Sequence, residues 1–487
     1  MSEGDFSFAT PESLGIPSGT ILDLLKDIRS HSIPLHSFLV MRHGYVAAEG
    51  YCAPFTQDRK HRMYSVSKSV VSVAVGMLID EGRLSLDSRI ADFFPEYVAD
   101  DTSDYLRKAT IRHLLMMATC NEHTAYHWND QDFVRAFFQN SETKHMPGAA
   151  FSYDTSATVT LCAVVEKLAG KPLLEYMRPL LDKLGISGDA WCIQTPEGRS
   201  WAGSGILFTT RDLARFAQLC LHMGESNGKQ LVSRNYMLQA TAEKIDNYVS
   251  DFGLARCGYG YQFWMIKDGF ACCGMGGQFA LMYPGKDLVV VTTADTQHIN
   301  AGDDFIRCCV ERMVESVGDH PLPENPAAQA ELTRQSVLSL PMRDGSAVSS
   351  MAEKISGARY MLEKNSLGYE WITMSFSDGL CTMTYSKRGE VLTLPLFLGR
   401  YGEFLFPEKY PGKNIAVKDT NYRCVSAAVW RGEHTLIGDI YAVDDYLGSI
   451  RLQCTFMGDT LTMLMTAAAE NFFLDYRGFL SGRLVRE

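Results

Sequence analysis

The segment from Tyr64 to Gly82 constrains the fold more than any other part of this chain. From Ser67 to Ile79 every residue except Lys68 is apolar or small, and Gly82 follows as a stop signal. This pattern predicts a helix that begins at or near Ser65 and ends at a glycine C-cap. A segment with so few polar positions predicts a buried helix.

Ser65 and Lys68 lie one helical turn apart, so their side chains are expected to be neighbours on one face. The field of the helix N-terminus favours an alkoxide on Ser65, and burial disfavours a charged Lys68. A partly neutral lysine can accept a proton from a serine, which activates the serine as a nucleophile. The alternative is a solvated helix start, because S-x-x-K is frequent by itself. A lysine that enters such an apolar helix favours the catalytic interpretation.

Length and charge narrow the class of protein. The chain has 487 residues, which predicts two or three domains. Its net charge of −11 argues against a nucleic-acid partner or an anionic membrane surface. The sequence contains no uninterrupted run of 18 or more apolar residues, so no membrane span is predicted. The first residues lack a signal-like pattern, so the 13 cysteines indicate reduced thiols, and we expect a cytoplasmic protein.

The first domain is predicted to span residues 1–320. A helix at 17–32 and two strands within 37–51 precede the Ser65 helix. Residues from about 83 to 200 have helical patterns and form a predicted inserted subdomain. Later strands are expected at 259–266, 277–282 and 288–293, followed by a helix at 302–317. Strands grouped in this way with helices predict an α+β fold, a helix-flanked antiparallel sheet.

A proline-rich break at Pro321–Pro326 opens a predicted linker with a helix, 321–356. From 357 to 487 the sequence changes to short runs of alternating polarity. These runs predict a separate C-terminal antiparallel β-barrel or sandwich. The expected strands are 371–376, 380–385, 391–397, 427–430, 435–442, 449–456, 460–466 and 472–476.

Two further motifs could join Ser65 and Lys68 in a site. Tyr153, in Phe151-Ser-Tyr-Asp-Thr155, could relay protons if a neighbouring lysine lowered its pKa. With 22 tyrosines in the chain, a packing role is the simpler alternative. In Cys272-Cys-Gly-Met-Gly-Gly277, the glycines permit close backbone approach and could expose an N–H to a substrate oxygen. The alternative there is an ordinary β-turn.

Metal sites are not predicted. Glu122-His-Thr-Ala-Tyr-His127 places two histidines four residues apart but lacks the H-E-x-x-H order. The pairs Cys272-Cys273 and Cys308-Cys309 have no partner at zinc-binding spacing. We therefore expect no metal and no cofactor, and a small molecule as the substrate. The oligomeric state is not indicated.

Taken in order, these motifs resemble the serine hydrolases of the class C β-lactamase and penicillin-binding type. The style is most similar to the branch of 6-aminohexanoate-dimer hydrolases and esterases. The resemblance covers roughly residues 10–320. The matching stretches are Tyr64–Lys68, Gly82–Asp87, Thr110–Leu115, Phe151–Tyr153, Gly203–Ala217 and Gly274–Gln278.

The resemblance implies that Ser65 is the acyl-forming nucleophile, Lys68 its proton acceptor and Tyr153 the second proton relay. It also implies an oxyanion hole formed by the backbone N–H groups of Ser65 and Met275. Gly274, Gly276 and Thr155 would border the substrate. The implied fold is a β-lactamase/transpeptidase-like one, with the active site between the sheet and the helical subdomain.

Two departures from the family pattern narrow the expected activity. The family's Tyr-x-Asn motif appears as Tyr153-Asp-Thr155, and Lys-Thr-Gly appears as Cys272-Cys-Gly274. The missing lysine normally helps to hold a substrate carboxylate, so we expect a hydrolase of amides or esters. The alternatives are a β-lactam-binding or D-amino-peptide hydrolase, or a catalytically idle binding protein of the same fold.

Overall fold

The computed structural model describes residues 6–140, 142, 144–249, 257–409, 421–470 and 472–485. The chain divides into two compact units. The first ends at Leu340, and the second consists of Gln297–Asn300 and the chain from Pro341 onward. The later boundary between the units therefore lies between Leu340 and Pro341.

The first unit is built on an eight-stranded sheet with the path β1-β3-β2-β12-β11-β10-β9, and β13 pairs with β3 beside β1. Its pairs are antiparallel except those of β1 and β13 with β3, which are parallel. The predicted helix-flanked antiparallel sheet is therefore confirmed, with short parallel additions at one edge. The strands are β1 Ser7–Phe8, β2 Leu35–Arg42, β3 Tyr45–Cys52, β9 Trp264–Ile266, β10 Gly269–Gly274, β11 Gln278–Tyr283, β12 Leu288–Ala294 and β13 Val337–Leu338.

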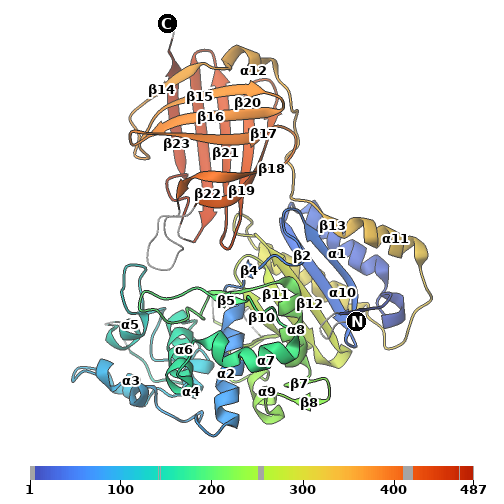
Figure 1. Cartoon of the computed structure of the whole chain (residues 1–487), viewed down its shortest axis with the longest axis vertical. Coiled ribbons are helices and arrows are strands. Elements are labelled where there is room, and N and C mark those ends of the chain that lie inside the picture. Colours follow the sequence, from blue (N-terminus) through green and yellow to red (C-terminus); the bar gives the residue numbers. More distant parts are fainter. Residues whose placement is uncertain are drawn as a thin grey trace. The chain divides into compact units, whose positions relative to one another are not determined.

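Helices cover both faces of this sheet, which explains its composition. The central strands β2, β11 and β12 are buried at every position, so most of their residues are apolar. Helices α2 (Val66–Asp80) and α8 (Thr210–Leu221) contact strands β10 to β12 on one face. Helices α1 (Ser18–Ser30), α10 (Gly302–Glu315) and α11 (Pro326–Gln335) pack together on the other side (Figure 1).

The region between α2 and α8 is mainly helical, as predicted. It also contains β5, which pairs with β6, and β6 in turn pairs with β4 just before Ser65. Its helices and short strands are η2 Ile90–Phe93, η3 Pro95–Tyr97, α3 Asp104–Lys108, α4 Ile111–Leu115, α5 Phe133–Gln139, α6 Thr155–Ala169, α7 Leu173–Leu184, β5 Trp191–Cys192 and β6 Ile206–Phe208; β4, His61–Arg62, precedes α2. The remaining elements of the unit are η1 Glu12–Leu14, β7 Glu225–Ser226, β8 Lys229–Gln230, α9 Arg234–Ala240 and η4 Pro284–Lys286.

The second unit is one ten-stranded antiparallel sheet that is nearly closed, which confirms the predicted barrel-like domain. Its edges approach where Leu398 bridges Ala428 and the Gly399 N–H donates to the Ala428 carbonyl, at 2.9 Å. The strand order is β17-β16-β15-β14-β23-β22-β21-β20-β19-β18. The strands are β14 Arg359–Leu362, β15 Tyr369–Ser377, β16 Leu380–Lys387, β17 Glu390–Phe397, β18 Gly402–Lys409, β19 Asn421–Arg431, β20 Thr435–Val443, β21 Leu447–Met457, β22 Thr460–Ala469 and β23 Gly478–Leu484; helix α12 spans Ser350–Ile355.

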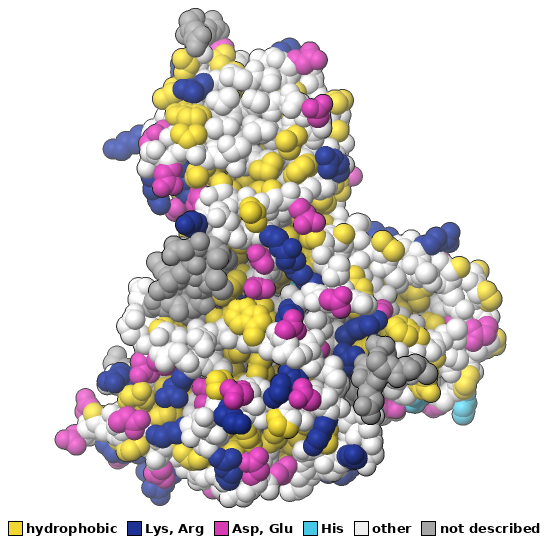
Figure 2. Space-filling model, in the orientation of Figure 1, with side chains coloured by type: hydrophobic (Ala, Val, Ile, Leu, Met, Phe, Trp, Pro, Cys, Tyr) yellow, Lys and Arg dark blue, Asp and Glu magenta, His cyan; other side chains and the backbone are white. Residues whose placement is uncertain are grey.

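The described surface is mixed in character. On the face shown in Figure 2, basic and acidic side chains alternate over both units, with apolar side chains between them. No helix among the described residues is long and apolar enough to span a membrane.

Candidate active site

Ser65 lies at the start of α2, as the N-cap residue, and is half-buried. Tyr64 before it is buried and has a φ of 47°, a left-handed conformation that bulky residues rarely adopt. The Arg62 guanidinium lies 4.2 Å from the Tyr64 ring centroid and donates to the Ser204 carbonyl and hydroxyl, each at 2.9 Å. This buried arginine therefore fixes the strained turn that presents Ser65.

Lys68 points at Ser65 from the first turn of α2. Its Nζ lies 3.0 Å from Ser65 Oγ and 2.6 Å from the Gly203 carbonyl oxygen. The residue is only 1% exposed. The amine is thus held inside the protein beside the hydroxyl, in contact with a carbonyl that sequence reasoning did not identify.

Tyr153 reaches the same place from the loop before α6. Its phenol hydrogen-bonds with the Ser65 side chain, and Lys68 Nζ lies 5.0 Å from its ring centroid. Burial raises the pKa of Tyr153, and the hydrogen bond with Ser65 opposes this only in part. The direction is opposite to the lowering expected beside a lysine, so the phenol stays protonated at neutral pH.

An aromatic wall, which no sequence motif indicated, packs around Tyr153. The Trp264 ring stacks on Tyr153 at 5.4 Å between centroids, while Tyr259 packs edge-on at 6.4 Å. Phe151 joins the wall at 5.9 Å from Trp264. These residues come from two segments more than 100 positions apart, so only the fold brings them together.

The turn between β10 and β11 carries the predicted oxyanion donor. A Cβ added at Gly274 would lie 2.2 Å from the Met63 carbonyl, so only glycine lets β10 end this close to the chain before Ser65. Gln278 fixes the turn by donating to the Met275 carbonyl at 3.0 Å. Within the described residues, the N–H groups of Ser65 and Met275 donate to no protein acceptor.

Gly276 has a different environment from Met275. Its N–H donates to the Asp303 carboxylate, and its carbonyl accepts from the Thr296 N–H at 3.3 Å. Its φ of 84° is one that glycine adopts readily. Both main-chain polar groups of Gly276 are therefore used inside the protein, which leaves only its Cα surface to border a substrate.

Thr155 lies at the first position of α6, against Gly203. A Cβ at Gly203 would approach the Thr155 methyl to 2.7 Å, so the carbonyl that binds Lys68 is packed directly against this helix. Asp154 caps α6 by accepting from the Ser156 N–H at 2.8 Å, and burial raises the pKa of Asp154 to about 6. Thr155 thus borders the site where the family has asparagine.

No group of three or more His, Cys, Asp or Glu side chains among the described residues is placed to hold a metal ion. Glu122 and His123, in the rejected histidine motif, are 66% and 73% exposed, respectively.

Comparisons with known proteins show the family to which the chain belongs. A family model described as Beta-lactamase matches residues 22–306. The chain is 27% identical to the 6-aminohexanoate-dimer hydrolase of Paenarthrobacter ureafaciens over 314 residues, which is 58% of this chain and 79% of that protein.

Solved structures share the fold. A putative 6-aminohexanoate-dimer hydrolase from Bacillus anthracis superposes with a TM-score of 0.53 at 21% identity, over 66% of this chain and 89% of its own. A novel penicillin-binding protein homolog from Caulobacter crescentus gives a TM-score of 0.52 at 17% identity, over 64% and 100%. The family model covers more than half of the sequence, and the resemblance found in the motifs is confirmed. The chain belongs to the beta-lactamase family of hydrolases.

Proposed function

We propose that the protein is a serine hydrolase that cleaves an amide or ester bond through an acyl-enzyme on Ser65. The observation that carries the proposal is the contact of 3.0 Å between Lys68 Nζ and Ser65 Oγ, made by a lysine that is 1% exposed. A buried amine at hydrogen-bond distance from a hydroxyl is the arrangement that nucleophile activation requires.

In acylation, neutral Lys68 takes the proton of Ser65 while Oγ attacks the substrate carbonyl. The carbonyl oxygen gains negative charge, which the N–H groups of Ser65 and Met275 would stabilise. The turn fixed by Gln278 and the close approach at Gly274 keep the second donor in position. The tetrahedral intermediate then expels the alcohol or amine.

Tyr153 supplies the proton that the leaving group needs. Since its pKa is raised by burial, the phenol is protonated and can donate at neutral pH. In deacylation water attacks the ester on Ser65, and Tyr153 and Lys68 carry the water proton away and return one to Oγ. Tyr153 thus acts as acid and then as base within one cycle.

Strand β10 favours a substrate without a carboxylate at this position. Burial raises the pKa of Cys272 to about 12, and it also raises that of Cys273, so both thiols are neutral. The strand therefore offers no cation where lactam-binding relatives carry lysine. The name of the Paenarthrobacter relative makes linear amides the first compounds to test.

The direct test is hydrolysis of p-nitrophenyl esters and short linear amides by the wild type and Ser65→Ala. We expect the variant to lose activity by at least a factor of about 10³. Ser226→Ala, in the β7–β8 hairpin, is the matched control and should retain full activity. Undiminished hydrolysis by Ser65→Ala would refute the assignment, and a preference for a penicillin over linear amides would favour the lactam-binding alternative.

A further inference from the structure

The interior of the C-terminal barrel is filled at one place by the segment 472–477, here called the plug, which joins β22 to β23. Phe472 packs edge-on against Tyr422 at 5.3 Å, and Phe473 lies 4.9 Å from the Phe406 ring. A Cβ added at Gly448 would lie 2.5 Å from the Phe472 ring, so β21 is shaped to admit it. The predicted strand at 472–476 is not present, because its aromatic residues enter the barrel instead.

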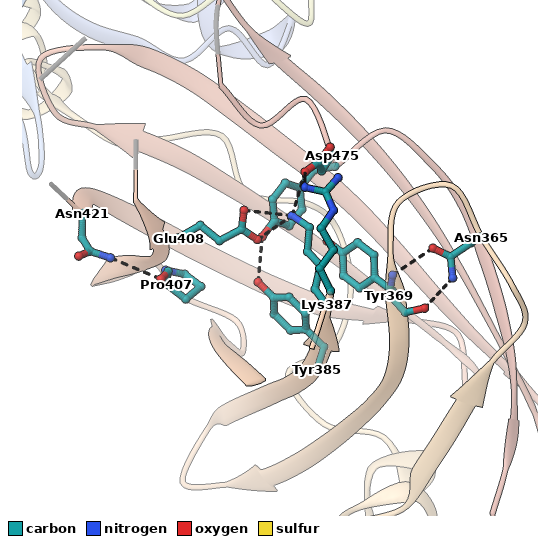
Figure 3. Close-up of polar contacts among 10 residues, drawn as sticks. Asn365, Tyr369, Tyr385, Lys387, Pro407, Glu408, Asn421 and Asp475 are labelled. Atoms are coloured by element: carbon teal, nitrogen blue, oxygen red, sulfur yellow. Dashed lines mark hydrogen bonds and ion pairs between the residues drawn. The ribbon is translucent and has the colours of Figure 1, made fainter. Parts of the chain in front are cut away.

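A buried lysine lies beneath the plug. Lys387 has a side-chain exposure of 4%, and its Nζ lies 2.8 and 3.0 Å from the two carboxylate oxygens of Glu408. The carboxylate of Asp475, in the plug, lies 3.3 Å from the same Nζ. It also lies 3.1 Å from the Arg388 guanidinium. Figure 3 shows Asp475 and Glu408 meeting at Lys387. With Asp475 the four groups carry no net charge, and without it they carry +1.

The plug is attached mainly through its side chains. The one main-chain hydrogen bond of residues 473–477 within the described chain is from the Tyr476 N–H to the Phe473 carbonyl, at 3.0 Å. Phe473 has a φ of 60°, which is unfavourable for an aromatic residue, and Gly478 follows with a φ of 142°. No strand ladder therefore has to break for the plug to leave, and glycine stands at its end.

Tyr369 provides a second, independent sign that a partner is missing. Its hydroxyl is buried and has no hydrogen bond, since its interaction with Tyr476 falls short of hydrogen-bond geometry. Lys387 Nζ lies 5.6 Å from the Tyr369 ring centroid. An unpaired buried hydroxyl is costly, and here it belongs to a ring that faces a buried cation. An anionic acceptor that took the place of Asp475 beside Lys387 would also give this hydroxyl a partner.

We propose that this barrel binds an apolar carboxylate, of the medium-chain fatty acid or arylalkanoic acid class, in the space that the plug occupies. The plug already provides the groups that such a ligand would provide. Its apolar side chains contact Phe406 and Tyr422, and its carboxylate pairs with Lys387. The ligand's chain replaces Phe472 and Phe473, and its carboxylate replaces Asp475, with the Tyr369 hydroxyl as an added donor. This site is separate from Ser65 and does not depend on the hydrolase assignment.

The test is a fluorescence titration of the full-length protein with 11-(dansylamino)undecanoate, which carries no ester or carboxamide. We expect weak saturable binding to the wild type and roughly tenfold tighter binding to Asp475→Asn, because the competing internal carboxylate is gone. Tyr369→Phe should weaken binding several-fold without loss of fold, and Lys387→Gln should abolish it. Asp378→Asn, in the exposed turn between β15 and β16, should bind as the wild type does.

Competition identifies the recognised group. Decanoate should displace the probe, and decanol at the same concentration should not. The proposal is overturned if neither wild type nor Asp475→Asn shows saturable binding, if decanol competes as well as decanoate, or if Tyr369→Phe and Asp475→Asn bind like the wild type. Near-UV circular dichroism checks the fold of Lys387→Gln; if that variant is unfolded, Tyr369→Phe and Asp475→Asn decide the outcome.

Discussion

The Lys68 amine lies within hydrogen-bond distance of two oxygen atoms. The Gly203 carbonyl lies 2.6 Å from Nζ and Ser65 Oγ lies 3.0 Å away. A neutral amine has two protons and one lone pair, so a proton given to the carbonyl orients the lone pair toward the hydroxyl. In the proposed mechanism, Gly203 would position the base through its main-chain carbonyl, which no side-chain motif reveals.

Replacement of Lys68 tests whether its amine accepts the proton of Ser65. Lys68→Ala removes the proton acceptor and should lower kcat for p-nitrophenyl esters by about 10²–10⁴, the usual range for a general base. KM should change little, since the amine is buried behind Ser65. Steady-state kinetics across pH measure both constants. Activity within a factor of two of the wild type would show that another group takes the proton.

Two buried histidines make the first unit sensitive to acid. His36 and His61 are each 1% exposed and stack on Phe55 at 4.0 and 4.7 Å. Burial lowers the pKa of His61 to about 3, and that of His36 lies well below its usual value. The unfolded chain therefore binds more protons below about pH 6.5. Stability is full above that pH and falls as pH drops toward the folded-state values.

One neutral substitution measures this effect. His36→Phe keeps the stack but cannot be protonated, so the wild type should lose about 2 kcal/mol more than the variant between pH 7 and pH 5. Urea unfolding at the two pH values gives the difference. His123→Gln, at a 73% exposed site, is the control and should follow the wild type. Identical pH dependence of His36→Phe and the wild type would contradict the account.

At the scale of elements, the helices and central strands were the parts that sequence patterns could predict. The apolar run behind Ser65 became α2, and the stretch Gly203–Ala217 contains the start of α8, which Thr209 caps in a capping box. The expected strand 259–266 is shorter, β9 Trp264–Ile266, because residues 259–263 are used in turn and bridge contacts instead. Strand β18 was not predicted, because Pro407 and the charged residues of this strand obscure the alternation of apolar and polar positions. Pro407 lies where the pairing of β18 with β19 shifts in register.

The site depends on how closely two of these elements approach. Gly274→Ala places a methyl group where the Met63 carbonyl lies, at 2.2 Å, so β10 must move away from the start of α2. We expect kcat to fall at least tenfold, since the Met275 N–H moves with the strand. Gly285→Ala, where nothing lies within 4 Å, is the matched control and should keep full activity.

The readout must distinguish site geometry from overall stability. Both variants are compared by thermal unfolding as well as by kinetics. A Gly274→Ala variant with wild-type kcat would show that the approach of β10 is unimportant to the reaction.

At the scale of the whole molecule, the chain consists of two units that each have a buried core. Units with separate cores commonly unfold as separate cooperative systems. The short runs of alternating polarity predicted where the second unit lies in the sequence. The ion pair inside this unit could not be predicted, because Lys387 and Asp475 lie 88 positions apart and only the folded barrel brings them together.

Calorimetry should therefore resolve two transitions in the intact protein. Lys387→Gln leaves Glu408 and Asp475 without their cation and should lower one transition temperature, while His36→Phe at pH 5 should raise the other. Each substitution should leave the second transition in place. A single transition that both substitutions shift would show that the two cores unfold as one.

Covalent labelling of Ser65 tests the central claim most directly. The intact protein is treated with a fluorophosphonate, digested and examined by mass spectrometry. The account predicts one equivalent of label on the peptide that carries Ser65, slower labelling in Lys68→Ala and none in Ser65→Ala. Label on another residue, or an unlabelled Ser65 in folded protein, would contradict the claim that this serine is the nucleophile.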